Sequence, residues 1–173
     1  MSEPLTWSYR ATEIPEAGLR ERRNATPDER VQVAAKLEVV SCEQLVSDFS
    51  IRSAGHGRYR LAGKVTAQLT QNCVVTLDPI AQNVEGSFDV QYWPAAKLPE
   101  SGEEEVEALN AAEIEPIEHG RIDAGRIIFE TLSASVDPYP RKPGAALQAG
   151  ELGDAAPSER GPFAALKKLK DRS

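Results

Sequence analysis

The chain has 173 residues, the length of one domain with or without terminal extensions, which argues against a two-domain enzyme with separate cofactor and substrate lobes. Twenty Lys and Arg residues stand against 27 Asp and Glu residues, so the net charge is −7. This charge excludes a protein whose whole surface is a basic platform for nucleic acid, although it leaves room for a local basic patch.

Cysteine usage and hydropathy predict a reduced, cytoplasmic protein. Cys42 and Cys73 are too few for a disulfide scaffold, so we expect both to be free thiols. Residues 1–10 lack the apolar core of a secretory signal. The longest uncharged run, residues 65–77, carries too many polar side chains to span a membrane.

The first predicted helix begins after Thr26. Thr26 supplies an N-cap hydroxyl, Pro27 suits the first helical position, and Glu29 completes a capping box three residues after the cap. The helix is predicted to end near Val39 and Val40, where β-branched residues accumulate.

Three strands are predicted next, at residues 45–52, 58–71 and 84–92. The middle strand places apolar or small residues at every second position, as one buried face requires: Tyr59, Leu61, Gly63, Val65, Ala67 and Leu69. The connections between these strands are too short for a helical crossover. The strands are therefore predicted to form an antiparallel meander, either open or barrel-like.

A second helix is predicted from Asp123 to about residue 136, where the sequence Asp-Pro-Tyr-Pro at 137–140 ends it. The fold class predicted from these elements is α+β, with an antiparallel sheet, two or three helices, an acidic loop and a flexible C-terminal tail. Residues 1–140 are expected to form one domain. Residues 141–161 are expected to be a flexible linker, and residues 162–173 a short basic amphipathic helix.

The charge is unevenly distributed along the chain. Residues 31–70 sum to +2, residues 101–120 to −7 and residues 141–173 to +3. The acidic block contains no Lys or Arg and is predicted to be a solvated loop; its glutamates are Glu103, Glu104, Glu105, Glu107, Glu113, Glu115 and Glu118.

Two segments are candidates for binding. In the acidic loop, the residues predicted to bind a partner are Glu103, Glu104, Glu105 and Glu107. In the tail, lysines could contact phosphates while apolar residues dock on a protein, which gives as candidates for RNA or partner contact Phe163, Leu166, Lys167, Lys168, Lys170 and Arg172.

No motif in the chain indicates catalysis. His56 and His119 lack partners at ligand spacing and are expected to be exposed loop residues. The acidic block lacks the converging turns of an oxygen-ligand cation site, and phosphate-binding loops and nucleophile elbows are missing. We therefore expect no catalytic residue, no metal site and no cofactor.

Several segments, taken in order, resemble the bacterial YceD family: residues 63–79 around Cys73, residues 114–117, residues 122–132 followed by 137–140, and residues 161–170. The family is named for accumulation of the large ribosomal RNA subunit. The resemblance implies a role in the synthesis, processing or stability of the large-subunit (23S) ribosomal RNA, without known catalytic activity. Many members carry a second cysteine three residues after the first, where this chain has Thr76. That departure favours a structural role for Cys73, and the surrounding sequence looks like the alphaproteobacterial branch.

The leading hypothesis is a non-enzymatic ribosome-biogenesis factor that contacts a ribosomal large-subunit protein or assembly factor, and ribosomal RNA as a second contact. One alternative is a metal- or thiol-dependent enzyme or module that uses Cys73 together with a histidine. Another is a structural adaptor of a different complex. No membrane partner is expected, and the sequence leaves the oligomeric state open.

Overall fold

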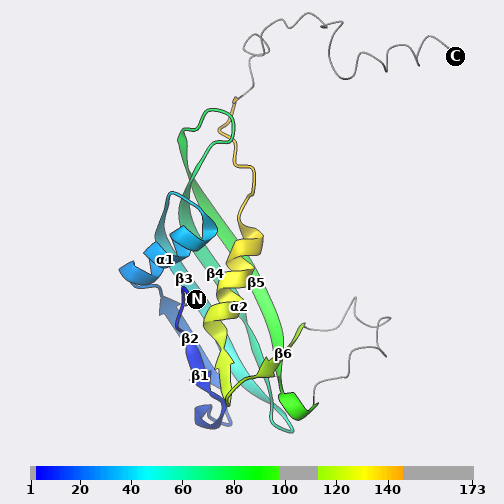
Figure 1. Cartoon of the computed structure of the whole chain (residues 1–173). Helices are drawn as coiled ribbons and strands as arrows, with labels where there is room; N and C mark the ends of the chain where they lie inside the picture. Colours follow the sequence, from blue (N-terminus) through cyan, green and yellow to red (C-terminus); the bar gives the residue numbers. More distant parts are fainter. Residues whose placement is uncertain (1–2, 98–112, 146–173) are drawn as a thin grey trace, which may run out of the picture. The chain divides into compact units, whose positions relative to one another are not determined.

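The computed structural model describes residues 3–97 and 113–145. The described residues up to Lys142 belong to one compact unit. The predicted linker (residues 141–161) and tail helix (residues 162–173) lie almost wholly outside the described residues. The elements of the compact unit, in chain order (Figure 1), are β1 (Ser8–Arg10), η1 (Ala11–Glu13), β2 (Leu19–Asn24), α1 (Pro27–Leu37), β3 (Ser41–Gly55), β4 (Arg58–Asn72), β5 (Pro79–Pro94), η2 (Ala95–Lys97), β6 (Glu113–Ile117), β7 (Arg121–Asp123) and α2 (Ala124–Ser135). The predicted α+β class is confirmed.

The main sheet has five strands in the order β2-β3-β4-β5-β6, and β1 pairs with β7 in a separate two-stranded sheet. Strands β2 to β5 are antiparallel, which confirms the predicted meander, whereas β6 runs parallel to β5. The barrel-like alternative is wrong, because the sheet is open: β2 and β6 are its edge strands, with no further partner in the part of the chain that the structure describes. The helices and the small sheet cover the apolar face that a barrel would have enclosed.

Local capping signals place both helices as predicted. The Thr26 hydroxyl accepts a hydrogen bond from the Glu29 N–H at 3.3 Å, and the Glu29 carboxylate accepts one from the Thr26 N–H at 2.9 Å. The Asp123 carboxylate accepts a hydrogen bond from the Arg126 N–H at 3.1 Å and so starts α2. No helix among the described residues is both long and apolar enough to cross a bilayer.

One part of the acidic block is a strand, so its prediction as a loop is wrong for residues 113–117. Strand β6 pairs with the edge of β5, and Glu115 on β6 forms an ion pair with Arg126 of α2. Arg126 also contacts Glu130 at 3.5 Å. The guanidinium therefore offsets the repulsion that the sequence implies, and the edge of β5 satisfies the backbone groups of β6.

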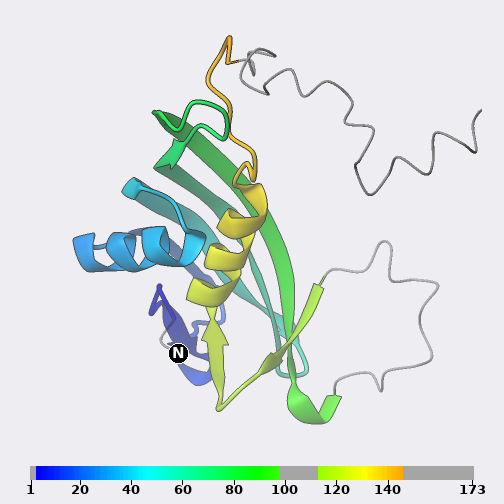
Figure 2. The ribbon, with the colours of Figure 1, turned by 45° about the horizontal axis from the view of Figure 1, so that its top comes forward.

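The core lies on one face of the main sheet. Leu61, Val65 and Leu69 of β4 are fully buried, which confirms the predicted alternation. The two helices and the N-terminal segment cover this face, with α2 lying within the curve of the long strands (Figure 2). No helix or strand in residues 3–97 and 113–145 covers the opposite face, where the alternate residues of β4 project.

Candidate functional site

The uncovered face of the main sheet carries an excess of positive charge, although the whole chain is acidic. The strand register assigns to this face the cationic side chains Arg20, Arg22, Arg52, Arg58, Arg60 and Lys64, and the carboxylates Glu43, Asp48, Glu85 and Asp89. The face therefore carries six cations and four carboxylates, although the net charge of the chain is −7. It is a local basic patch, which the composition had left possible.

The cations gather in the half of the face nearest the β3–β4 hairpin. Arg52 of β3 lies directly opposite Arg60 of β4, and Lys64 lies opposite Asp48, which in turn lies opposite Arg22 of β2. Like charges placed opposite each other on neighbouring strands destabilise a sheet. Asp89 offsets the charge of Arg60 through a two-point ion pair. Arg52 is therefore the member of the pair whose charge no described carboxylate offsets.

Ion pairs neutralise part of this patch. Arg60 donates through Nε to Asp89 Oδ1 at 2.7 Å and holds the pKa of the Asp89 carboxyl below its ordinary value. Arg22 lies 3.7 Å from Asp48. Among the described residues, no ion pair engages the three remaining exposed cations, Arg20, Arg52 and Lys64.

Trp93 lies at the end of the patch nearest the β3–β4 hairpin, next to Arg58. The Arg58 guanidinium lies 4.0 Å from the centroid of the Trp93 ring, and Trp93 Nε1 donates to Gln91 Oε1 at 3.1 Å. The Arg58 Nε atom is buried and lacks a hydrogen-bond partner within the described part of the chain. The contact places a half-buried cation and a half-buried aromatic ring beside the arginine cluster.

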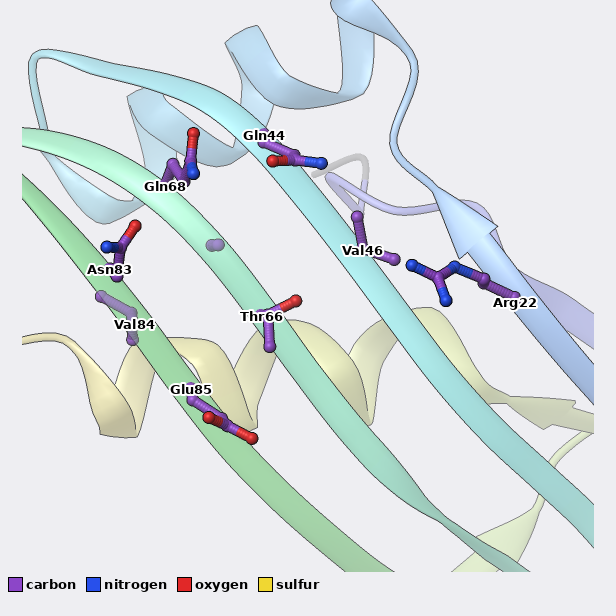
Figure 3. Close-up of a pocket in the computed structure, with 9 residues that line it drawn as sticks. Arg22, Gln44, Val46, Thr66, Gln68, Asn83, Val84 and Glu85 are labelled. Carbon is purple, nitrogen blue, oxygen red and sulfur yellow. The ribbon is translucent and has the colours of Figure 1, made fainter.

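The other half of the face holds an open groove lined by uncharged polar side chains together with apolar and charged ones (Figure 3). Its volume is about 400 Å³, and amide and hydroxyl side chains from three strands project into it between Arg22 and Glu85: Gln44, Thr66, Gln68 and Asn83. Side-chain amides carry both donors and acceptors, so this half can hydrogen-bond a polar ligand without adding charge.

Cys73 lies in the β4–β5 connection and is held by backbone hydrogen bonds. Its Sγ atom accepts N–H groups from Thr76 and Lys142, each at 3.4 Å, and these donors, with that of Lys142 first, lower the pKa of the thiol to about 6. The side chain is fully buried, and the Val74 N–H donates to the carbonyl of Pro140 at 2.9 Å. Cys73 and Val74 therefore connect residues 140–142 to the end of the sheet. Thr76 contributes both its N–H and its side-chain hydroxyl to the thiol.

The proposed combination of Cys73 with a histidine is wrong. Cys73 follows the last residue of β4, whereas the exposed His56 precedes the first, and 15 residues of strand separate two points by roughly 50 Å. His119, also exposed, follows β6 at the far end of β5 from Cys73. Within residues 3–97 and 113–145, no group of three or more His, Cys, Asp or Glu side chains is placed to hold a metal ion.

The two thiols are free and buried, as expected, but their environments differ. Burial raises the pKa of Cys42 to about 11, against about 6 for Cys73. Close to Cys73, three exposed apolar side chains form a second surface feature: Val74, Leu77 and Tyr139, exposed by 44%, 74% and 71%.

The sequence analysis looked for binding residues in the acidic loop and the tail and did not consider the face of the sheet. The predicted acidic-loop residues 103–107 and tail residues 163–172 lie outside the described residues, so those predictions stand untested. The basic face was missed because its cations come from β2, β3 and β4. The +2 sum of residues 31–70 reflects the cations of β3 and β4 but not Arg20 and Arg22 of β2.

Comparison with known proteins gives one match. A family described as "Large ribosomal RNA subunit accumulation protein YceD" matches residues 61–170. The chain belongs to the YceD family. In this YceD family member, the matched span covers most of β4 and everything after it up to residue 170, whereas Arg20, Arg22 and Arg52 precede it. No curated protein and no solved structure gives a significant match. The family description links the chain to accumulation of large-subunit ribosomal RNA.

Proposed function

We propose that this protein is a non-enzymatic, cytoplasmic factor of ribosome biogenesis that supports the synthesis, processing or stability of 23S ribosomal RNA. It acts by contacting ribosomal RNA and a protein of the large subunit or of its assembly. The observation that carries the proposal is a basic sheet face on an acidic chain whose family is described by large-subunit RNA accumulation.

The layout of the charged groups favours binding over chemistry. Side chains on one face of a strand repeat about every 6.7 Å, and neighbouring strands lie about 4.8 Å apart, so the cations form an open array suited to an extended ligand. General acid–base or nucleophilic catalysis instead requires groups that converge on one reacting atom. Cys73, whose pKa is lowered, is enclosed and engaged by backbone N–H groups.

A protein contact is proposed for other parts of the chain. The apolar side chains of Val74, Leu77 and Tyr139 are exposed. Val74 and Leu77 lie three residues apart in one turn, and the Val74 N–H donates to the carbonyl of Pro140, the neighbour of Tyr139. Exposed apolar side chains of this kind are suited to burial against a partner protein. The acidic loop at 103–107 and the tail at 163–172 carry opposite charges and would attract basic protein and RNA respectively.

The test is deletion of the gene followed by measurement of the 23S to 16S ribosomal RNA ratio. We expect the ratio to fall and to recover when the wild-type gene is returned. An unchanged ratio, with normal 23S precursors, would refute the proposal. Co-purification of the tagged protein should also recover large-subunit components, and their absence would remove the role in assembly.

A further inference from the structure

We infer that the uncovered face of the sheet binds single-stranded RNA, with its arginine-rich half holding phosphates and its amide-lined groove contacting bases. The choice of RNA as the partner rests on the proposed function. The binding surface, and the assignment of one half to phosphates and the other to bases, rest on the positions of the side chains in the structure.

The arginine-rich half of the face is suited to phosphates. Arg20, Arg52 and Lys64 are exposed and lack ion pairs among the described residues, so their charges are available to a ligand. Arg58 and Lys64 lie six residues apart on β4, which is about 20 Å along the strand, and β2 lies about 10 Å from β4 across the sheet. An array of this size can follow several successive phosphates of one strand.

The groove and the Arg58–Trp93 pair are suited to bases. Gln44, Gln68 and Asn83 present amide donors and acceptors in the groove, and the Arg58–Trp93 pair offers a plane for stacking at the other end of the face. Unpaired bases expose their hydrogen-bonding edges and their flat faces, whereas an A-form duplex hides its base edges in a deep, narrow major groove. The combination of amides and a stacking plane therefore favours single-stranded RNA over duplex RNA.

The test measures fluorescence anisotropy of a labelled single-stranded RNA of about 16 nucleotides with the purified full-length protein, between roughly 50 and 200 mM salt. The phosphate variant is Arg20→Gln/Arg52→Gln/Lys64→Gln. The matched control removes three exposed cations that lie off this face, Arg10→Gln/Lys36→Gln/Arg141→Gln. Melting temperatures show that each variant is folded.

We expect the phosphate variant to bind ten- to a hundredfold more weakly, and the slope of log K against log salt to become shallower by about 2, at about 0.7 per lost contact. The control variant should bind as the wild type does. A groove variant, Gln44→Ala/Gln68→Ala/Asn83→Ala, should bind at least about fivefold more weakly with an unchanged slope, because it removes hydrogen bonds and no charge.

Three results would overturn the inference: no RNA binding at the lowest salt, equal losses in the phosphate and control variants, or tighter binding of a duplex of the same sequence. If RNA binding is absent while 23S accumulation still requires Arg20, Arg52 and Lys64, the proposed function stands and an acidic protein occupies the face. If the phosphate variant loses RNA binding but deletion of the gene leaves the 23S to 16S ratio unchanged, the inference stands and the proposed function fails.

Discussion

Gly63 in the middle of β4 is predicted to be a position where even alanine destabilises the fold. It lies opposite Phe49 on β3 and Phe88 on β5, on the face that packs into the core. A Cβ atom at this position would lie 2.5 Å from Phe49 Cβ and 2.7 Å from Phe49 Cα, and would also contact the carbonyl oxygen of Asp48. Because backbone atoms of β3 form this contact, a side-chain rotation cannot relieve it.

The expected effect of Gly63→Ala is a loss of about 2 kcal/mol in the free energy of unfolding. Overpacking costs about 1–3 kcal/mol and more where the backbone must shift, while alanine regains about 0.5–1 kcal/mol of strand stability over glycine. At about 2–4 °C per kcal/mol, the melting temperature should fall by roughly 4–8 °C. Urea and thermal denaturation followed by circular dichroism would measure both quantities.

Gly86→Ala on β5 is the matched comparison. Its new Cβ would meet Ser135 Oγ at 2.6 Å and Thr131 Cγ2 at 2.8 Å, which are ends of side chains that can move. We therefore expect a loss below about 1 kcal/mol. If Gly63→Ala proves no more destabilising than Gly86→Ala, the close approach of β3 and β4 at this point is incorrect.

Four further outcomes are expected. Leu61→Ala should cost about 2–5 kcal/mol in chemical denaturation, and unchanged stability would contradict the burial of this face of β4. The pKa of Cys73 is about 6 in the folded chain against an ordinary 9.0, so the stability that its thiolate confers is present above pH 9 and is lost as the pH falls to 6. The melting temperature of Cys73→Ala should lack this part of the pH dependence. If the wild type and the variant show the same dependence of melting temperature on pH, the lowered pKa is refuted. Arg52→Gln relieves repulsion from Arg60 and should leave stability unchanged or raise it by up to about 0.5 kcal/mol, whereas a clear loss would give Arg52 a role in folding. Phe163→Ala should weaken docking of a partner in co-purification with little change in melting temperature, and a large drop would show that Phe163 packs on the core.

The sequence alone determined the elements whose signals are local. The capping residues Thr26 and Asp123 located both helices, because an N-cap acts within its own first turn. Alternation in residues 58–71 located β4 and its buried face, because side chains of a strand alternate whatever its neighbours are. The ordered motifs from Gly63 onward pointed to the family that the comparison shows.

Tertiary structure decided the rest, because those features depend on which segments become neighbours. Strand β2 has no apolar alternation and forms by pairing with β3 along six residues, and β6 forms in an acidic segment because Arg126 and the edge of β5 hold it. The basic face likewise forms only when its strands pair. Its six cations lie on three strands, and each strand contributes only one to three of them. Pairing register and the placement of both helices on the opposite side bring these charges together on a surface that faces solvent.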